Sequence, residues 1–222
     1  MGMFKSIALA AGISAVAALG AQAATVSINA SPDINSLKST STSLPDGGSW
    51  APTPNEAHST TGSVSGIAKS PYGDTTTPYW FVESVDTTSK GGFPVNSPAI
   101  LLLKSVRTSL SLLWGSPDVY NKLVLKLAGA EVYSISGEEL GGTAYVRPSG
   151  SVATTEGPTS FLTIAGVKFD SVEFYSSNTW EGKTVTKNAF EFGNVAAVPV
   201  PAAGLMLIAG LGGLAAVRRR KA

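Results

Sequence analysis

The chain has 222 residues, 16 basic and 15 acidic side chains, one histidine and no cysteine. Without cysteine there are no disulfides, no thiol chemistry and no cysteine metal sites. Five of the basic residues lie outside residues 24–197, which carry 11 basic and 15 acidic side chains, a net charge of −4. This central part offers no basic patch for nucleic acid, so we expect no nucleic-acid partner.

Residues 1–23 have the pattern of a secretory signal peptide. Lys5 precedes the apolar run Ile7–Leu19, which as a helix reaches only ~20 Å. The small residues Ala21 and Ala23 follow, so we expect signal peptidase to cut between Ala23 and Ala24. A first transmembrane helix is the alternative, and the shortness of the apolar run disfavours it.

Residues 24–98 form the loop-rich part of a single predicted domain, 24–197. They are rich in Ser, Thr, Pro and Gly, with brief apolar runs at Val64–Ala68 and Tyr79–Ser84, and we expect long loops between a few strands. A low-complexity linker is the competing interpretation. The large aromatic side chains favour partial packing instead; they are Trp50, Tyr79, Trp80 and Phe81.

Residues 99–197 form the strand-dense part of the domain. Short apolar or alternating runs are separated by Gly, Pro, Ser, Asn or Asp, as expected for strands between turns. The runs are Ala99–Lys104, Thr108–Gly115, Asn121–Gly129, Ala130–Ser136, Thr143–Arg147, Ser160–Gly166, Asp170–Ser177 and Asn188–Ala196. The spacing predicts an all-β fold, an antiparallel β-sandwich of the jelly-roll type.

Alternation within two of these runs predicts strands with one buried face and one wet face. Leu123, Leu125 and Leu127 lie opposite Lys122, Val124 and Lys126. Phe190 and Phe192 lie opposite Glu191 and Gly193.

The segment Ser111–Leu125, "SLLWGSPDVYNKLVL", predicts a strand ending at Trp114, a tight connection through Gly115–Asp118, and a second strand from about Asn121. Glycine and proline set the turn geometry, and Asp and Asn side chains bond to nearby amides. We therefore expect a structural role for this segment.

Catalytic patterns are weak, and we predict no catalytic residue, no metal site and no cofactor. His58, the single histidine, stands in a Ser/Thr-rich stretch without a G-x-S-x-G elbow, so we expect a solvated loop residue. Glu138 and Glu139 are neighbours at a turn and do not form a glycosidase pair. Loop oxygens could serve calcium, although turn capping is favoured for each; they belong to Asp33, Asp46, Asp74, Asp118 and Asn121.

The tail, residues 198–222, has three parts. "VPVPA" is extended because Pro199 and Pro201 fix φ and lack N–H groups; its residues are Val198, Pro199, Val200, Pro201 and Ala202. Residues 202–217 are uncharged and give about 24 Å of helix, enough for a slightly short transmembrane span. Four cations follow, which hold the C-terminus in the cytoplasm: Arg218, Arg219, Arg220 and Lys221.

This tail resembles the VPLPA variant of the PEP-CTERM sorting signals on envelope proteins of Gram-negative bacteria, with Val200 where Leu is usual. The resemblance implies recognition by an integral-membrane exosortase, removal of the helix, and a cell-envelope, outer-surface or extracellular location after transient attachment to the inner membrane. A retained single-pass anchor is the alternative.

Inside the domain, "LWGSPDVYN" resembles the LWGSPDxYN signature of PEP-CTERM-type surface proteins. The closing strand of that group is matched by "NAFEFGNVA", Asn188–Ala196, and the resemblance spans about residues 112–197. Gly193 stands where that strand commonly has Asp, so no ligand role of the Asp carries over.

Two function classes follow. The first is a non-enzymatic surface or matrix protein, with exopolysaccharide as the candidate ligand and exposed aromatics as candidate contacts; these are Trp50, Trp80 and Trp180. For each of these Trp side chains, core packing or a loop anchor is the favoured alternative. The alternative is a secreted hydrolase that uses loop carboxylates, which a pocket with two clustered carboxylates would favour.

Overall fold

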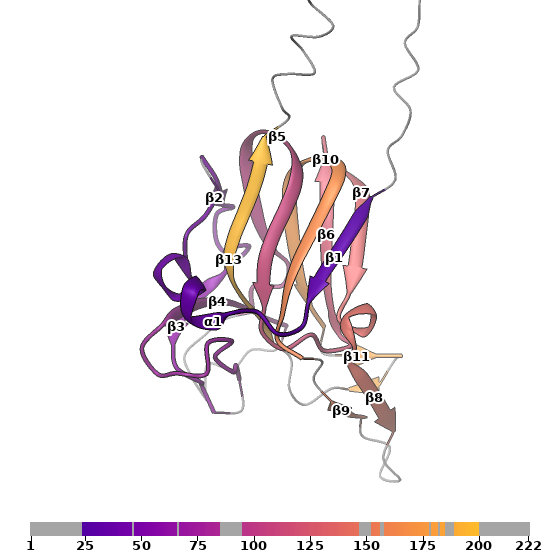
Figure 1. Ribbon diagram of the computed structural model, residues 1–222. Helices are drawn as coiled ribbons and strands as arrows, with labels where there is room; N and C mark the ends of the chain where they lie inside the picture. The colour runs from indigo at the N-terminus through magenta and orange to yellow at the C-terminus, as the bar shows by residue number, and fades with distance from the viewer. Residues whose placement is uncertain are drawn as a thin grey trace, which may run out of the picture.

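The computed structural model describes residues 24–45, 47–65, 67–84, 95–146, 152–155, 158–177, 179–181, 183–184 and 189–199. The regular structure in these residues is mostly antiparallel β-sheet (Figure 1), which confirms the all-β prediction. The helical elements in these ranges are α1 (Ile34–Leu37) and the 3-10 turns η1 (Lys38–Thr40) and η2 (Glu138–Leu140). No helix within them has the length and apolarity to cross a membrane. The predicted leader 1–23 and sorting helix 202–217 lie outside the described residues.

The strands alternate with loops along the whole domain. Their bounds are β1 (Thr25–Asn29), β2 (Ser49–Trp50), β3 (His58–Thr61), β4 (Pro78–Glu83), β5 (Ala99–Trp114), β6 (Asn121–Leu127), β7 (Ala130–Ser136), β8 (Thr143–Val146), β9 (Val152–Thr155), β10 (Ser160–Ser176), β11 (Thr179–Trp180), β12 (Lys183–Thr184) and β13 (Ala189–Pro199). The main sheet has the order β3-β4-β13-β5-β10-β6-β7, with β1 added beside β10 and β2 beside β5. Two small ribbons, β8-β9 and β11-β12, complete the fold.

Two long strands carry the architecture, and the sequence prediction of four separate strands was wrong for them. The runs 99–104 and 108–115 belong to one strand, β5, and the runs 160–166 and 170–177 belong to β10. Gly166, with φ of +86°, is not a turn between two strands. It lies at the register shift of β10 against β5, where a bulge bends the strand without ending it.

The bends let β5 and β10 serve two sets of neighbours. The second half of β5 and the first half of β10 pair with β13 and β1, respectively. The first half of β5 pairs with β2, and the second half of β10 pairs with β6. The inner faces of these two halves pack on one another, an arrangement consistent with a sandwich.

Aromatic side chains fill the space between the halves. Phe174 from the second half of β10 stacks on Phe192 of β13, with ring centroids 4.2 Å apart. Phe190 stands edge-on to both of them and stacks on Trp114 at 4.1 Å. The predicted inward orientation of Phe190 and Phe192 is therefore confirmed.

The opposite face of β13 is not wet, contrary to expectation. The segment between β3 and β4 folds over it and buries Ile67, Ala68 and Tyr72 in a second, smaller apolar cluster. Glu191 is buried beneath this cover, and its carboxylate accepts the Lys69 N–H at 2.9 Å. On β6 the alternation is also incomplete, because Val124 is only 2% exposed although it shares a face with exposed Lys122.

Candidate functional site

The start of β1 and the end of β13 lie at the same end of the main sheet. Thr25 pairs with Ala165, Ala165 pairs with Ser109, and Ser109 pairs with Val198, so the start of β1 and the end of β13 lie in one cross-strand row (Figure 1). Three strand spacings separate them, which is about 14 Å. Val198 and Pro199, the first residues of the predicted sorting motif, are also the last residues of β13. Val200, Pro201, Ala202 and the four terminal cations lie outside the described residues, as does Ala23.

The "LWGSPDVYN" segment closes the opposite end of β5. Trp114 is fully buried against Phe190, and the Gly115 N–H donates to the Glu191 carbonyl oxygen at 2.8 Å. A side chain at position 115 would press on Pro71, because a Cβ there would lie 2.8 Å from the Pro71 Cβ. Close packing against Pro71 and Glu191 therefore favours glycine at position 115.

Ser116, Asp118 and Asn121 are buried polar residues of this turn. The Tyr120 hydroxyl donates to the Asp118 carboxylate at 2.7 Å. The Asn121 side-chain amide donates to the Ser116 and Ala189 carbonyl oxygens at 3.2 and 3.1 Å, which ties the turn to the start of β13. The structural role predicted for the segment fits these contacts.

Two glycines allow the chain after β7 to lie directly on the Asp118 backbone. A Cβ on Gly137 would overlap the Asp118 carbonyl oxygen, and a Cβ on Gly142 would overlap that of Pro117. The "GEELGG" segment is thus packed backbone to backbone against "GSPD". Sequence reasoning missed this pairing because the two segments are about twenty residues apart and neither contains a pattern that specifies the other.

Asn194 is a second buried polar centre, and it was not among the predicted residues. Its side-chain amide donates to the Leu37 carbonyl oxygen at 2.7 Å and to the Thr40 hydroxyl at 2.8 Å, and its carbonyl oxygen accepts the Tyr72 hydroxyl at 2.5 Å. Burial raises the pKa of Tyr72 well above its ordinary value, so the hydroxyl stays protonated and donates. With φ of +53°, Asn194 occupies the left-handed region at the bulge of β13. A Gly-Asn pair inside a strand pattern is the one sequence signal for such a bulge.

The same network leaves no room for a side chain at position 193. A Cβ at position 193 would overlap the Tyr72 hydroxyl and lie 2.7 Å from the Ser41 carbonyl oxygen. The space that an aspartate side chain would need is filled by Tyr72. Gly193 is therefore a packing residue in this chain.

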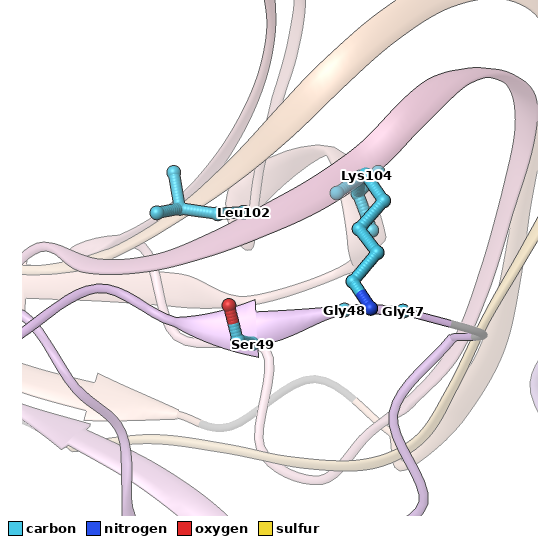
Figure 2. Close-up of a pocket in the computed structure, with 6 residues that line it drawn as sticks. Gly47, Gly48, Ser49, Leu102 and Lys104 are labelled. Carbon is cyan, nitrogen blue, oxygen red and sulfur yellow. The ribbon is translucent and has the colours of Figure 1, made fainter.

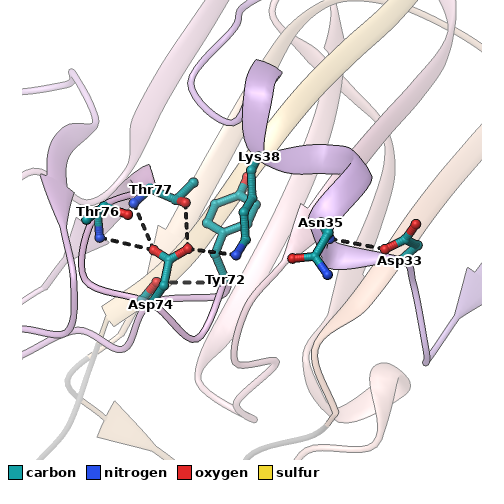
Figure 3. A network of polar contacts seen from close by, with 8 residues as sticks. Asp33, Asn35, Lys38, Tyr72, Asp74, Thr76 and Thr77 are labelled. Carbon is teal, nitrogen blue, oxygen red and sulfur yellow. Dashed lines mark hydrogen bonds and ion pairs between the residues drawn. The ribbon is translucent and has the colours of Figure 1, made fainter.

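The loop carboxylates act locally, as predicted for turn caps. Asp33 caps α1 by accepting the Asn35 N–H, and Asp74 accepts the N–H groups of Thr76 and Thr77 (Figure 3). The Lys38 ammonium lies 2.9 Å from the Asp74 carboxylate. This contact, together with the Thr77 N–H, holds the pKa of Asp74 well below its usual range.

Trp50 and Trp80, proposed as ligand contacts, lie against the aromatic core. Their ring centroids are 5.4 Å apart, and Trp50 also stands edge-on to Phe174 and Phe192. Both indole N–H groups are buried and have no acceptor among the described residues. The half-buried rings therefore do not form a surface platform. Trp180 lies in β11, and its side chain is outside the described part of the structure.

A hollow beside β2 is one described surface that could receive a ligand (Figure 2). It has a volume of ≈ 260 Å³ and is lined by Gly47, Gly48, Ser49, Leu102, Leu103 and Lys104. Leu102 is 43% exposed and supplies an apolar wall. Figure 2 shows the Lys104 side chain reaching from β5 to the Gly47–Gly48 backbone. Gly47 has φ of +70°, and a Cβ there would lie 2.6 Å from Lys104 Cδ, so glycine leaves room for the Lys104 side chain.

The residues weighed for catalysis are not brought together. His58 lies in β3, half-buried and 5.5 Å from the Phe81 ring, so the expectation of a solvated loop was wrong. The strand forms because β4 offers an unpaired edge to the Ser/Thr-rich segment. Glu138 and Glu139 are exposed in η2, where Glu139 accepts the Ser136 N–H at 2.7 Å. Among the described residues, no three His, Asp or Glu side chains cluster as metal ligands would. Asp46 is outside those residues.

No family model, curated protein or solved structure matches this chain.

Proposed function

We propose that the chain is an exported bacterial surface or extracellular-matrix protein that is sorted by an exosortase and binds exopolysaccharide without catalysing a reaction. In this proposal residues 1–23 are removed by signal peptidase, and the apolar tail attaches the domain to the inner membrane until it is processed. We also propose that the β-domain is a jelly roll and that it lies between a removable leader and a sorting helix.

The observation that carries the proposal is that Thr25 and Val198 lie at the same end of the main sheet. The two segments with targeting patterns join the domain in one cross-strand row. Because both targeting segments leave the same end of the domain, both can lie close to the membrane. A signal peptidase and an exosortase would act there. The loops at the opposite end of β5 then face away from the membrane.

The β2 hollow supports a binding role. Sugars bind proteins through apolar contact with their C–H faces and hydrogen bonds to their hydroxyls. Leu102 offers the first kind of contact, and the Ser49 hydroxyl and Lys104 ammonium offer the second. The loop carboxylates, in contrast, are held by their own turns, which favours binding over a hydrolase that uses them.

The sorting step is tested by replacing Pro199 and Pro201 together with Ala in the full chain, in its native host. The change keeps the apolar length and the cations, so insertion should survive, while the loss of both prolines lets the segment leave its extended form. We expect uncleaved protein in the membrane fraction and less at the surface or in the medium. Val200→Leu, which restores the usual VPLPA pattern, is the matched control and should be processed normally. Unchanged mass and release of the double variant would count against the sorting role.

The binding role is tested by a pull-down with the extracellular polysaccharide of the host. Lys104→Ala should reduce the retained fraction, because the hollow loses its cation. Lys168→Ala removes an exposed lysine from β10 outside the hollow and serves as the control. Equal retention of the two variants and the parent protein would exclude the β2 hollow as the binding site.

A further inference from the structure

Strand β1 is an edge strand that contributes almost nothing to the core. All five of its side chains are exposed, including Val26 at 36% and Ile28 at 46%. It pairs with β10 in unbroken register from Thr25↔Ala165 to Asn29↔Phe161, and no strand in the described ranges pairs with its other edge. The outer N–H and C=O groups of β1 are therefore available to another strand.

This edge lacks the protection that exposed strands usually have. Natural edges carry charges or prolines, or are bulged or very short. β7 carries Glu131 and a register shift against β6, and β2 has two residues. β1 has five residues, "TVSIN", with no charge, no proline and no register shift.

The sequence of β1 is complementary to itself. Two antiparallel copies centred on Ser27 place Thr25 opposite Asn29 of the second copy and Val26 opposite its Ile28. Val26 and Ile28 share a face with Ile164 and Leu162, their fully buried partners on β10. Pairing would thus continue the apolar inner face from one copy into the next.

We propose that β1 is a self-association edge, through which two copies of this chain pair antiparallel about Ser27 and join their sheets. The occupant is a second copy because the edge is uncharged along its whole length, so two copies meet without repulsion and with matched apolar pairs. The paired strand is short, and its area falls below the ~800 Å² per partner of a standard interface. The association is consequently weak in dilute solution and increases with the density of the protein on a surface.

The absence of cysteine makes a direct test possible in the full chain. In Ser27→Cys the two thiols face each other across the axis, because Cα atoms of directly opposed residues are ~4.5–5.5 Å apart, within the range of a disulfide. In the control Thr25→Cys, the new cysteine lies on the same strand and the same face as position 27 and is also exposed. It is four residue steps, ~14 Å, away from position 25 of the second copy. Both variants keep the same tail, so contact through the tail cannot distinguish them.

The variants are oxidised under identical conditions and dimers are counted on a non-reducing gel. We expect a disulfide-linked dimer for Ser27→Cys and none for Thr25→Cys. Adding Val26→Lys to Ser27→Cys should abolish the dimer by placing like charges along the shared edge, while circular dichroism remains unchanged. The proposal is overturned if neither variant forms the dimer, if both form it equally, or if Val26→Lys leaves it intact.

Discussion

Asn194 should be the polar side chain on which the attachment of the N-terminal segment to β13 most depends. It is 7% exposed and joins three groups: the Leu37 carbonyl oxygen, the Thr40 hydroxyl and the Tyr72 hydroxyl. Each such hydrogen bond contributes about 1 kcal/mol. Because Leu37 and Thr40 lie near the surface, water replaces part of that loss, and we expect about 2 kcal/mol from the side chain. An alanine at φ of +53° costs about 1 kcal/mol more than a residue that tolerates this conformation.

Urea unfolding of three variants separates the hydrogen-bond contribution of Asn194 from the cost of its backbone conformation. Asn194→Ala should lower the free energy of unfolding by about 3 kcal/mol and Asn194→Gly by about 2 kcal/mol, since glycine keeps the backbone conformation. Tyr72→Phe should cost about 1 kcal/mol, and combining it with Asn194→Gly should cost about 1 kcal/mol less than the sum of the single changes. If Asn194→Ala and Asn194→Gly were equally stable, the backbone argument would fail. Full additivity with Tyr72→Phe would refute the hydrogen bond between the two side chains.

Three further predictions concern the turns. Asp118→Ala should lower the free energy of unfolding by about 1–2 kcal/mol in urea, because the buried Tyr120 hydroxyl loses its acceptor; an unchanged midpoint would exclude this role. Gly137→Ala should cost more than about 3 kcal/mol or prevent folding, as judged by circular dichroism, because its Cβ overlaps the Asp118 carbonyl oxygen. Asp74→Asn should lower the Tm at neutral pH, because Lys38 lowers the pKa of Asp74 in the folded protein and the charged carboxylate stabilises the fold. The difference in Tm from the parent protein should shrink as the pH falls below about 4, where protonation removes this contribution. A difference independent of pH would contradict the ion pair.

Local patterns in the sequence predicted strand type and position well where the alternation was strict. β7 occupies Ala130–Ser136, as expected, and Phe190 and Phe192 face the core. The large aromatics of the first third are packed, which agrees with the interpretation as folded loops and disagrees with a linker. These features depend on neighbouring residues alone, so a single sequence contains them.

Features that depend on distant segments were missed. Gly166 suggested a turn, but the continuation of β10 is stabilised by pairing with β5 on one side and with β1 and then β6 on the other. The alternation on β13 predicted a solvent-exposed Glu191. The prediction failed because the segment that covers this residue lies about 120 residues earlier in the chain. Trp50 was only a candidate ligand contact, with core packing favoured, and the pairing of β2 with β5 places its ring against the aromatic core.

The candidate site was predictable only where it depends on terminal patterns. The tail has a proline motif, an apolar run and a basic cluster in that order in the sequence. The structure adds that Val198 and Pro199 are the last residues of a paired strand, β13. The β2 hollow could not be foreseen, because it arises where the left-handed Gly47 meets Lys104 from a strand more than fifty residues away.

Intact-mass analysis of the protein recovered from the surface or medium of its native host tests the central claim most directly. We predict a chain that begins at Ala24 and lacks residues 202–222, so that it ends close to the last residues of β13. A surface protein that still contains residues 202–222 would contradict the sorting role and support a retained anchor. Retention of residues 1–23 would contradict export through signal peptidase.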